Sequence, residues 1–382
     1  MMKKSKNPRI RFKGFTDDWE QRKLSEITAE FKSGENIKSN ELENFGTYPV
    51  YGGNGLRGYS EHYNHDGEYA LIGRQGALCG NMNYSTGKAY FTEHAVAVSE
   101  NYYSNTRFLY YLLLKMDLGK YSDQSAQPGL AVNKLIKLYT YVPERNEQVE
   151  IALLLKKIDE LITLHQRKLE KLELMKKSLL QKMFPKSGNV NPKIRFKGYT
   201  DDWEQRKLGN IAKFINGRAY SQEELLNSGK YKVLRVGNFY TNDSWYYSNL
   251  ELDDKYYAND GDLLYTWSAT FGPHIWHGER VIYHYHIWKV DLSNELDIHF
   301  LVHLLEQDKS YILLGHNGST MVHITKVGME QKEVIIPQCI EEQKQLGLLF
   351  DSLDSLITLH QRKLEKLKLL KKTLLQDMFP SE

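Results

Sequence analysis

Two stretches of the chain carry apolar residues with the spacing of a coiled coil. The apolar positions recur at alternating intervals of three and four residues, which is the a/d pattern of a heptad repeat. One His and one Lys interrupt the pattern in each stretch. The first stretch contains Leu155, Ile158, Ile162, His165, Leu169, Leu172, Lys176, Leu179 and Met183, and the second contains Phe350, Leu353, Ile357, His360, Leu364, Leu367, Lys371, Leu374 and Met378. Pro185 and Pro380 follow at equivalent points and predict the two helix ends.

Each stretch predicts a helix of about 30 residues, which is roughly 45 Å long. A narrow apolar stripe on so long a helix needs a partner of similar length, and the other helix of the same chain is the obvious one. The alternative is that each helix lies on its own domain, but helices on a domain surface usually have a broader apolar stripe. We interpret His165 and His360 as seam residues that fix the register of the pair, because a polar group in a seam often does so.

The helices belong to a longer internal repeat. The segment PRIRFKGFTDDWEQRKLSEIT at 8–28 returns as PKIRFKGYTDDWEQRKLGNIA at 192–212, and LITLHQRKLEKL occurs identically at 161–172 and 356–367. Trp19 corresponds to Trp203, an offset of 203 − 19 = 184, whereas His165 corresponds to His360, an offset of 360 − 165 = 195. The second copy is therefore 11 residues longer, and the added residues lie inside it. Such a repeat predicts pseudo-twofold symmetry and an antiparallel pair of helices.

The segments between the matching ends differ in sequence and predict α+β domains. Runs rich in β-branched and aromatic residues occur at 67–73, 89–99, 232–240 and 280–290, bounded by Gly, Asn and Asp. Short apolar helices are predicted at 106–116 and 297–307. The predicted organisation is a first recognition domain at 1–148, a helix at 149–186, a second recognition domain at 187–340 and a second helix at 341–382.

Composition describes a globular protein rather than a membrane or disulfide-stabilised one. Hydrophobic residues make up 41% and charged residues 26% of the 382 residues. We expect no membrane span, because no run of about 18 apolar residues occurs, and no secretory signal, because the basic N-terminus lacks an apolar stretch. Cys79 and Cys339 are the two cysteines, which fits a reducing cytoplasm. The net charge of +3 permits a polyanionic partner, and the 26 tyrosines suit either a binding surface or a core.

The repeated segments resemble the specificity subunit of type I restriction–modification systems. The resemblance rests on the DDWEQRKL motif, the proline followed by Glu-Gln at each helix start (PERNEQ at 143–148 and PQCIEEQ at 337–343) and the LITLHQRKLEKL helix, and it covers nearly the whole chain. It implies two target-recognition domains that each read one half of a split DNA site, and an antiparallel coiled coil that separates them. It also implies two methylation subunits that methylate adenine, and restriction subunits that translocate and cleave DNA. The partner subunits would use S-adenosylmethionine, ATP and Mg, and this chain would need no cofactor.

Polar and aromatic residues among glycines are the candidates for DNA contact, because they offer groups for phosphates and base edges. The alternative is ordinary turn chemistry, which uses the same residue types. The first insert offers Tyr51, Asn54, Arg57, Tyr59, Arg74, Gln75, Asn81, Asn83, Gln124, Ser125 and Gln127. The second insert offers Arg218, Tyr220, Ser221, Arg235, Asn238, Trp267, Ser268, Ser319 and Thr320.

We expect no catalytic site in this chain. His274, His277, His284 and His286 have spacings that could bind zinc, but no Cys lies nearby and no H-E-x-x-H motif occurs, so we interpret the last two as one face of a strand. Neither GGNG nor GRQG continues as a P-loop, and Asn-Pro-Pro-Tyr/Phe, the adenine methyltransferase motif, is absent. A stand-alone two-headed DNA-binding regulator and a nuclease that uses the His cluster are the competing interpretations. The recognised bases and the length of the gap between half-sites do not follow from the sequence.

Overall fold

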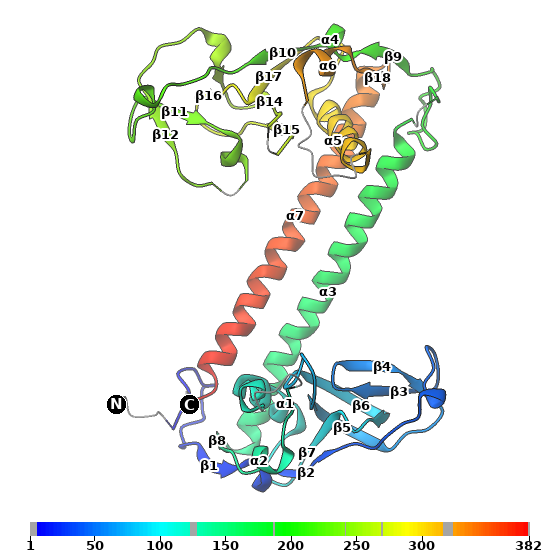
Figure 1. The fold of residues 1–382 in the computed structure, drawn as a ribbon, viewed down its shortest axis with the longest axis vertical. Coiled ribbons are helices and arrows are strands. Elements are labelled where there is room, and N and C mark those ends of the chain that lie inside the picture. Colours follow the sequence, from blue (N-terminus) through cyan, green and yellow to red (C-terminus); the bar gives the residue numbers. More distant parts are fainter. Residues whose placement is uncertain are drawn as a thin grey trace. The chain divides into compact units, whose positions relative to one another are not determined.

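The computed structural model describes residues 6–122, 128–185, 188–240, 242–268, 270–315 and 324–380. For residues 310–315 it describes the backbone. The candidate residues Gln124, Ser125, Gln127, Ser319 and Thr320 lie outside these ranges. The chain divides into two compact units (Figure 1). Unit 1 comprises residues 1–167 and 361–382, and unit 2 comprises residues 168–360. Within the described ranges, no helix is long and apolar enough to cross a membrane.

Unit 1 is built on a six-stranded sheet. Its strand order is β2-β7-β5-β6-β3-β4, in which β3 and β6 run parallel and the other neighbours antiparallel. The strands are β2 (Thr28–Ser33), β3 (Tyr48–Gly52), β4 (Gly55–Ser60), β5 (His65–Gly73), β6 (Met82–Phe91) and β7 (Ala95–Glu100). Helix α1 (Thr106–Met116) buries Phe108, Leu109 and Leu112 in the same core as Ala70 and Val98 of the sheet. A separate pair joins β1 (Glu20–Lys23) to β8 (Tyr139–Val142), and α2 (Val132–Leu135) precedes β8.

Unit 2 contains two four-stranded sheets. The first has the order β10-β17-β14-β15 and consists of β10 (Ala212–Asn216), β17 (Ile287–Leu292), β14 (Leu263–Thr266) and β15 (Gly272–Ile275). The second has the order β12-β11-β16-β13 and consists of β12 (Tyr246–Ser248), β11 (Tyr231–Leu234), β16 (Val281–Tyr283) and β13 (Tyr257–Ala258). Strands β9 (Glu204–Lys207) and β18 (Glu333–Ile336) form a separate pair, and the helices are α4 (Leu208–Ile211), α5 (Ile298–Gly315) and α6 (Lys326–Gln331).

Short 3₁₀ helices complete both units. They are η1 (Leu24–Glu26), η2 (Ser39–Glu41) and η3 (Leu118–Tyr121) in unit 1, and η4 (Gln222–Glu224), η5 (Val236–Phe239) and η6 (Asp254–Tyr256) in unit 2.

Two long helices, α3 (Arg145–Met183) and α7 (Ile340–Asp377), contribute to both units. In unit 1, Lys371 of α7 forms an ion pair with Asp159 of α3 at 2.6 Å. In unit 2, Lys176 of α3 forms the equivalent pair with Asp354 of α7 at 2.5 Å. Within unit 1, Leu155 shares a core with Met378 while Asp159 pairs with Lys371, so the two helices run antiparallel there, and the same Lys–Asp pair recurs in unit 2.

The helix bounds and the compact units differ from the sequence prediction. Helix α3 starts at Arg145 rather than 149, because the first turn is held by the contacts described below. Helix α3 ends three residues before its predicted limit (186 − 183) and α7 five residues before its own (382 − 377). The predicted domain boundaries also cut each helix away from its domain, whereas the end of α7 belongs to unit 1. The twelve seam residues from Leu155 to Leu172 and from Phe350 to Leu367 are buried or half-buried.

Each core is closed by the chain segment that follows a long helix. In unit 1, Phe379 stacks on Phe108 with ring centroids 5.5 Å apart and meets Trp19 edge-on. In unit 2, Phe184 stacks on Phe300 at 5.6 Å and meets Trp203 edge-on. Unit 1 is thus completed by the end of α7, and unit 2 by the end of α3.

The repeated polar motifs serve to anchor the long helices. Glu147 is fully buried and accepts two hydrogen bonds from Arg11, at 2.8 and 2.7 Å; Arg195 and Glu342 repeat this pair in unit 2. Gln148 donates to the Pro143 carbonyl and accepts from the Asn105 amide, and Gln343 repeats this with Pro337 and Asp297. The Glu-Gln pair that follows Pro143 after three residues, and Pro337 after four, therefore joins each helix start to its domain.

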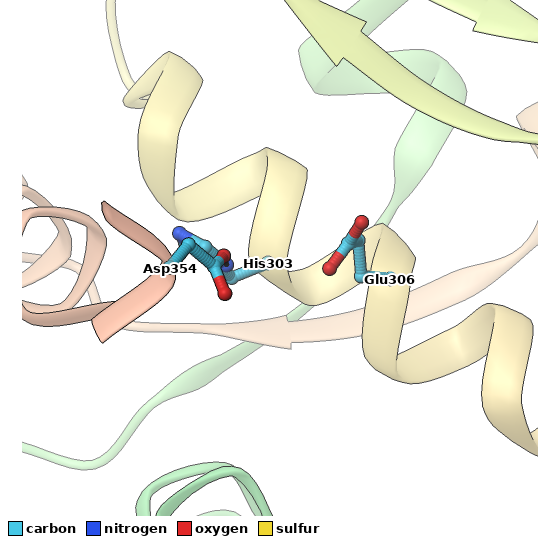
Figure 2. A group of neighbouring side chains, drawn as sticks. All are labelled: His303, Glu306 and Asp354. Atoms are coloured by element: carbon cyan, nitrogen blue, oxygen red, sulfur yellow. Dashed lines mark ion pairs between the residues drawn. The ribbon is translucent and has the colours of Figure 1, made fainter. Parts of the chain in front are cut away.

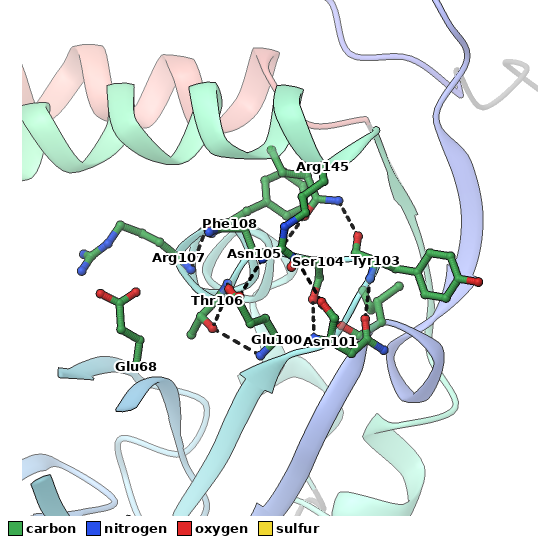
Figure 3. A network of polar contacts seen from close by, with 12 residues as sticks. Glu68, Glu100, Asn101, Tyr103, Ser104, Asn105, Thr106, Arg107, Phe108 and Arg145 are labelled. Atoms are coloured by element: carbon green, nitrogen blue, oxygen red, sulfur yellow. Dashed lines mark hydrogen bonds and ion pairs between the residues drawn. The ribbon is translucent and has the colours of Figure 1, made fainter. Parts of the chain in front are cut away.

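Unit 1 adds a second anchor at the start of α3 (Figure 3). Arg145 pairs with Glu100 at 2.6 Å and donates to the carbonyls of Asn101 and Ser104. Glu100 also accepts from the Thr106 amide at the start of α1, and Asn105 caps that helix. These contacts keep the pKa of the Glu100 carboxyl below its usual range despite the opposing effect of burial.

Two predicted strands are broken in the structure. The run at 280–290 divides into β16 and β17 around a turn at 284–286, and the run at 89–99 divides into β6 and β7 around 92–94. In unit 2 the turn carries the chain from one sheet to the other, which a single strand could not do. His284 and His286 therefore occupy a turn and not one face of a strand. The run at 232–240 also ends early, because η5 follows β11.

Candidate nucleic-acid interface

The turn after β6, residues 92–94, together with Arg74, which contacts it, is called the edge of unit 1. The backbone N–H of Arg74 donates to the His94 carbonyl at 2.9 Å, and the N–H of Glu35 donates to the Phe91 carbonyl at 2.9 Å. Gly34 lies against this turn so closely that a Cβ would stand 2.0 Å from the Phe91 oxygen, which explains the glycine. The Arg74 guanidinium donates to Ser33 at 3.2 Å and stays half-buried.

A glycine-lined cleft of about 420 Å³ opens beside this edge. Its polar lining residues are Asn54, Arg57, Gln75 and His94, and the first three are exposed. A Cβ on Gly73 would approach the Gly53 oxygen to 2.2 Å, so the two backbone segments touch directly. The structure therefore brings together Asn54, Arg57 and Gln75, which the sequence suggested only as separate residues.

The remaining candidates of unit 1 differ in exposure. Tyr51 is half-buried against Phe91, with ring centroids 6.1 Å apart, and Tyr59 is half-buried on β4. Asn83 is half-buried on β6, where its oxygen faces Gly55. Asn81 is exposed, and its carbonyl accepts from the Gly73 amide. Asn81 is thus the most accessible of these four.

Unit 2 carries an equivalent edge at the turn after β16. The Trp267 amide donates to the His286 carbonyl at 3.2 Å, and its indole N–H donates to the Tyr285 carbonyl at 2.9 Å. Tyr285 is 40% exposed, and its ring lies 4.0 Å from His286 and 4.3 Å from His284, measured between centroids. The sequence prediction missed Tyr285. Tyr285 lies where the predicted strand at 280–290 is interrupted, and the predicted strand at 89–99 is interrupted at the matching place in unit 1.

Several predicted residues of unit 2 have structural partners. Arg218 makes two hydrogen bonds to Glu224, at 2.9 and 2.6 Å, and Glu224 also accepts from the Ser221 amide. These contacts lower the pKa of Glu224 to about 2, so Arg218 is neutralised as a phosphate ligand. Asn238 accepts from the Arg235 amide and donates to the carbonyls of Asn242 and Ser244, so its amide holds the loop.

The other predicted residues lie near the turn. Tyr220 is half-buried, and its ring stacks toward His284 with centroids 6.5 Å apart. Within the described part of the chain, its hydroxyl has no hydrogen-bond partner. Burial raises the pKa of the Tyr220 phenol. The Arg235 guanidinium lies over the Tyr246 ring at 4.2 Å, and Ser268 follows Trp267 as a half-buried residue.

Burial keeps three histidines of unit 2, His274, His284 and His286, in the neutral form at neutral pH. Burial lowers the pKa of His274 and of His284 to about 4, and it also lowers the pKa of His286. His274 instead stacks on Phe239 with centroids 4.2 Å apart and shares a hydrogen bond with Tyr240. Neutral imidazoles cannot act as phosphate counter-ions, but they can donate to and accept from base edges.

One group among the described residues has the composition of a metal site: His303, Glu306 and Asp354 (Figure 2). Each offers an atom within 4.8 Å of the others. The ammonium of Lys176 already lies 2.5 Å from Asp354 and 3.5 Å from Glu306, and it supplies the positive charge that the carboxylates require. The four histidines singled out in the sequence take no part in this group. We therefore interpret the group as an ion-pair cluster that joins α3, α5 and α7.

The chain matches the family of type I restriction modification DNA specificity domains twice, over residues 16–174 and 200–369. It is 42% identical over 156 residues to the EcoprrI specificity subunit of Escherichia coli, a match that spans 40% of this chain and 39% of that subunit. It is 24% identical to a putative type I restriction enzyme specificity subunit of Haemophilus influenzae, over 89% of each chain.

Solved structures agree with this fold. The S subunit of a type I restriction–modification system from M. genitalium gives a TM-score of 0.73 at 16% identity, covering 98% of this chain and 100% of that one. A chain from a study of complex assembly in the type I system gives a TM-score of 0.51 at 14% identity, covering 96% and 99%. Both matches carry the same repeated α+β architecture. The two family matches together span most of the sequence, and the chain belongs to the type I restriction–modification DNA specificity family.

Proposed function

We propose that this chain is the sequence-specific DNA-recognition subunit of a type I restriction–modification complex, in which each unit reads one half of a bipartite site. The main observation behind this proposal is that the two units share the repeated segments around their inserts, including the Arg11–Glu147 and Arg195–Glu342 ion pairs, whereas the inserts differ in sequence. A repeated frame holds two binding surfaces in one way, and different inserts give them different targets.

The long helices offer two matching surfaces for partner subunits. Five apolar residues of α3 remain exposed, and five of α7 repeat them at an offset of 195. They are Leu153, Leu161, Leu164, Leu174 and Met175, repeated as Leu348, Leu356, Leu359, Leu369 and Leu370. Leu153, Leu164 and Met175 are 11 residues apart, which is close to three helical turns and keeps them on one face. We assign these two faces to two methylation subunits, since exposed apolar stripes mark interaction sites.

The catalytic work belongs to the partners in this proposal. Methylation subunits would bind S-adenosylmethionine and methylate adenine, and restriction subunits would use ATP and Mg. This chain would bind no cofactor of its own and act in the cytoplasm.

Exchange of one insert tests the proposal. Residues 30–140 are replaced by the matching segment of a relative in a host with the complete system, and the methylated motif is read by sequencing modified bases. We expect one half of the motif to change and the other half to persist. The equivalent exchange in unit 2 serves as the control and should change the other half. A change in both halves, or methylation that does not depend on this chain, would contradict the proposal and favour the stand-alone regulator.

A further inference from the structure

We infer that three structurally matched positions determine which bases each unit prefers: Arg74, Glu93 and His94 in unit 1, and Trp267, Tyr285 and His286 in unit 2. This inference rests on the proposed function and adds the side chains that would carry the specificity. Glu93 and His94 lie in the turn after β6, and Tyr285 and His286 lie in the turn after β16. Arg74 and Trp267 directly follow β5 and β14, and their backbone N–H groups donate to the carbonyls of His94 and His286.

The two turns have the same backbone hydrogen bonds. In unit 1, Glu35 donates to the Phe91 carbonyl and Arg74 to the His94 carbonyl; in unit 2, Arg218 donates to the Tyr283 carbonyl and Trp267 to the His286 carbonyl. Two more bonds match, from Thr92 to Tyr51 and Ala95 to Thr92 in unit 1, and from His284 to Leu234 and Ile287 to His284 in unit 2. The offset along the turn is constant, since 286 − 94 = 192 and 283 − 91 = 192. The backbone at these positions is therefore shared although the inserts differ.

The side chains on this shared backbone differ in charge and shape. In unit 1 the edge carries Arg74 and Glu93, and His94 lies 3.1 Å from the Glu93 carboxylate. The second oxygen of Glu93 is buried and has no hydrogen-bond partner among the residues that the structure describes, which is unusual for a carboxylate. An arginine offers paired donors to guanine, and a carboxylate accepts from the amino group of cytosine. The chemistry of this edge suits a G·C pair.

The edge of unit 2 offers aromatic faces and neutral donors. Trp267 meets His286 edge-on with ring centroids 5.1 Å apart, and its indole bond to the Tyr285 carbonyl fixes the turn. Arg218, whose backbone N–H donates to the Tyr283 carbonyl beside this turn, has its guanidinium paired with Glu224. Apolar and aromatic groups contact the methyl group of thymine, and a neutral imidazole can donate to an acceptor on the same edge. This edge suits an A·T pair.

The same glycine contact supports both turns. Gly217 lies so close to the turn of unit 2 that a Cβ would stand 2.3 Å from the His284 oxygen, as Gly34 does in unit 1. A tightly fixed backbone presents its side chains in a defined direction, which base discrimination requires. By contrast, the Asn238 amide is fully used inside its loop, and we exclude it from the specificity positions.

The test uses the assembled complex of full-length chain and methylation subunits, and a DNA pool with both half-sites randomised. Bound DNA is sequenced, so the readout needs no turnover. The variants are Arg74→Ala and Glu93→Gln in unit 1, and Tyr285→Ala and His286→Asn in unit 2. Tyr102→Ala is the matched control, because Tyr102 is 86% exposed and lies outside the edge. We expect each edge variant to lose about 5- to 150-fold discrimination at one or two positions of its own half-site.

A graft sharpens the test. The double variant Trp267→Arg with Tyr285→Glu carries the unit 1 side chains into unit 2 and should shift the preferred pair there toward G·C. Unchanged base preferences in variants that melt like the parent would overturn the inference while leaving the proposed function intact. A unit 2 variant that alters both half-sites, or a parent complex that selects no bipartite sequence, would instead overturn the proposed function. Loss of all preference in one half-site, with the other retained, supports the inference.

Discussion

The two units use different residues at the junction where α3 and α7 meet the helix of the domain, which is α1 in unit 1 and α5 in unit 2. In unit 1, Tyr111 of α1 donates to Asp159 of α3 at 2.8 Å, and Lys371 of α7 pairs with the same carboxylate. In unit 2 the equivalent positions hold His303, Asp354 and Lys176 (111 + 192 = 303; 159 + 195 = 354; 371 − 195 = 176). His303 turns its Nε2 to a further carboxylate, Asp351, at 2.8 Å.

The difference shows which parts of the frame are fixed. The Lys–Asp pair is identical in both units, so it secures the antiparallel helices. The residue on the domain helix varies, because a phenol and an imidazole are both flat, buried and able to donate one hydrogen bond. The unit 2 junction contains two more carboxylates: Asp351 pairs with His303, and Glu306 pairs with Lys176. The equivalent positions in unit 1 hold Lys156 and Leu114. Unit 2 therefore has the more highly charged junction.

The largest effect should come from removing the aromatic ring that closes a core. Phe379→Ala should destabilise unit 1 by about 3 to 5 kcal/mol, because it leaves a cavity beside Trp19 and Phe108. Hydrogen exchange should rise in residues 16–142 and remain unchanged in unit 2. Phe184→Ala should give the reverse pattern. Leu369→Ala, at an exposed site of α7, the helix that precedes Phe379, is the control. Equal exchange in both units would refute the assignment of each helix end to its unit.

A smaller effect should appear on acidification, and in unit 2 first. The pKa of His274 falls from 6.5 to about 4 on folding, so the unfolded chain binds more protons between these values and stability drops as the pH falls through that window. At pH 5 the loss from this residue is about 2 kcal/mol. His284 and His286 shift in the same direction and also lie in unit 2.

Melting curves at pH 7 and pH 5, with hydrogen exchange to separate the units, measure this effect. His274→Asn should flatten the pH dependence of unit 2, because it removes the titrating group. Carboxylates such as Glu100, whose pKa is lowered, lose their contribution only below about pH 4.5 and so act outside this window. If unit 1 melts first on going from pH 7 to pH 5, the account is wrong.

The hydrogen bond of the phenol at the unit 1 junction should be worth less. Tyr111→Phe keeps the ring and the Lys371–Asp159 pair but removes the donor to Asp159, which should cost about 1 kcal/mol. Burial and Asp159 raise the pKa of Tyr111, so the loss should be the same from pH 6 to pH 9. Urea unfolding followed by tryptophan fluorescence measures it. A loss that varies across this range would show that another group titrates at the junction.

The smallest effect on stability should accompany a change in partner binding. Leu164→Glu replaces an exposed residue of α3 and should alter stability by no more than about 0.5 kcal/mol. It should nevertheless remove one of two methylation subunits from the purified complex, and Leu359→Glu should remove the other. Lys168→Glu, which changes charge at another exposed position of α3, is the control. Retention of both subunits in the Leu164→Glu variant would show that the apolar faces have another role.

The repeat made the helices and their symmetry predictable from sequence. The identical segments and heptad spacing gave two long helices and two α+β inserts, and the structure contains both. The spacing could not reveal which core receives Phe184 and which receives Phe379, because the two segments are nearly identical. The partner of each seam lysine was equally hidden, since Asp159 and Asp354 lie outside the apolar stripe.

Individual site residues were harder to predict. Asn238 and Arg218 were both predicted to contact DNA. In the structure the Asn238 amide donates to the backbone of its own loop, and the Arg218 guanidinium pairs with Glu224. Turn residues that hold a loop and turn residues that contact a ligand are of the same types, and only their hydrogen bonds separate them. Tyr285 was not predicted as a site residue, because the run at 280–290, rich in β-branched and aromatic residues, predicts one continuous strand instead of a turn.

The closure of unit 1 by Phe379 has a consequence for the newly made chain. The ribosome delivers the N-terminal sheet first, but Phe379, the ring that completes its core, follows its counterpart Phe184 by 379 − 184 = 195 residues. At synthesis rates of about 5 to 20 residues per second, that delay is about 10 to 40 s. Unit 2 has all of its residues, 168–360, before unit 1 receives its last ones. The N-terminal unit should therefore be the last to mature, and a chain cut short in its final 20 residues would leave that unit with an open core.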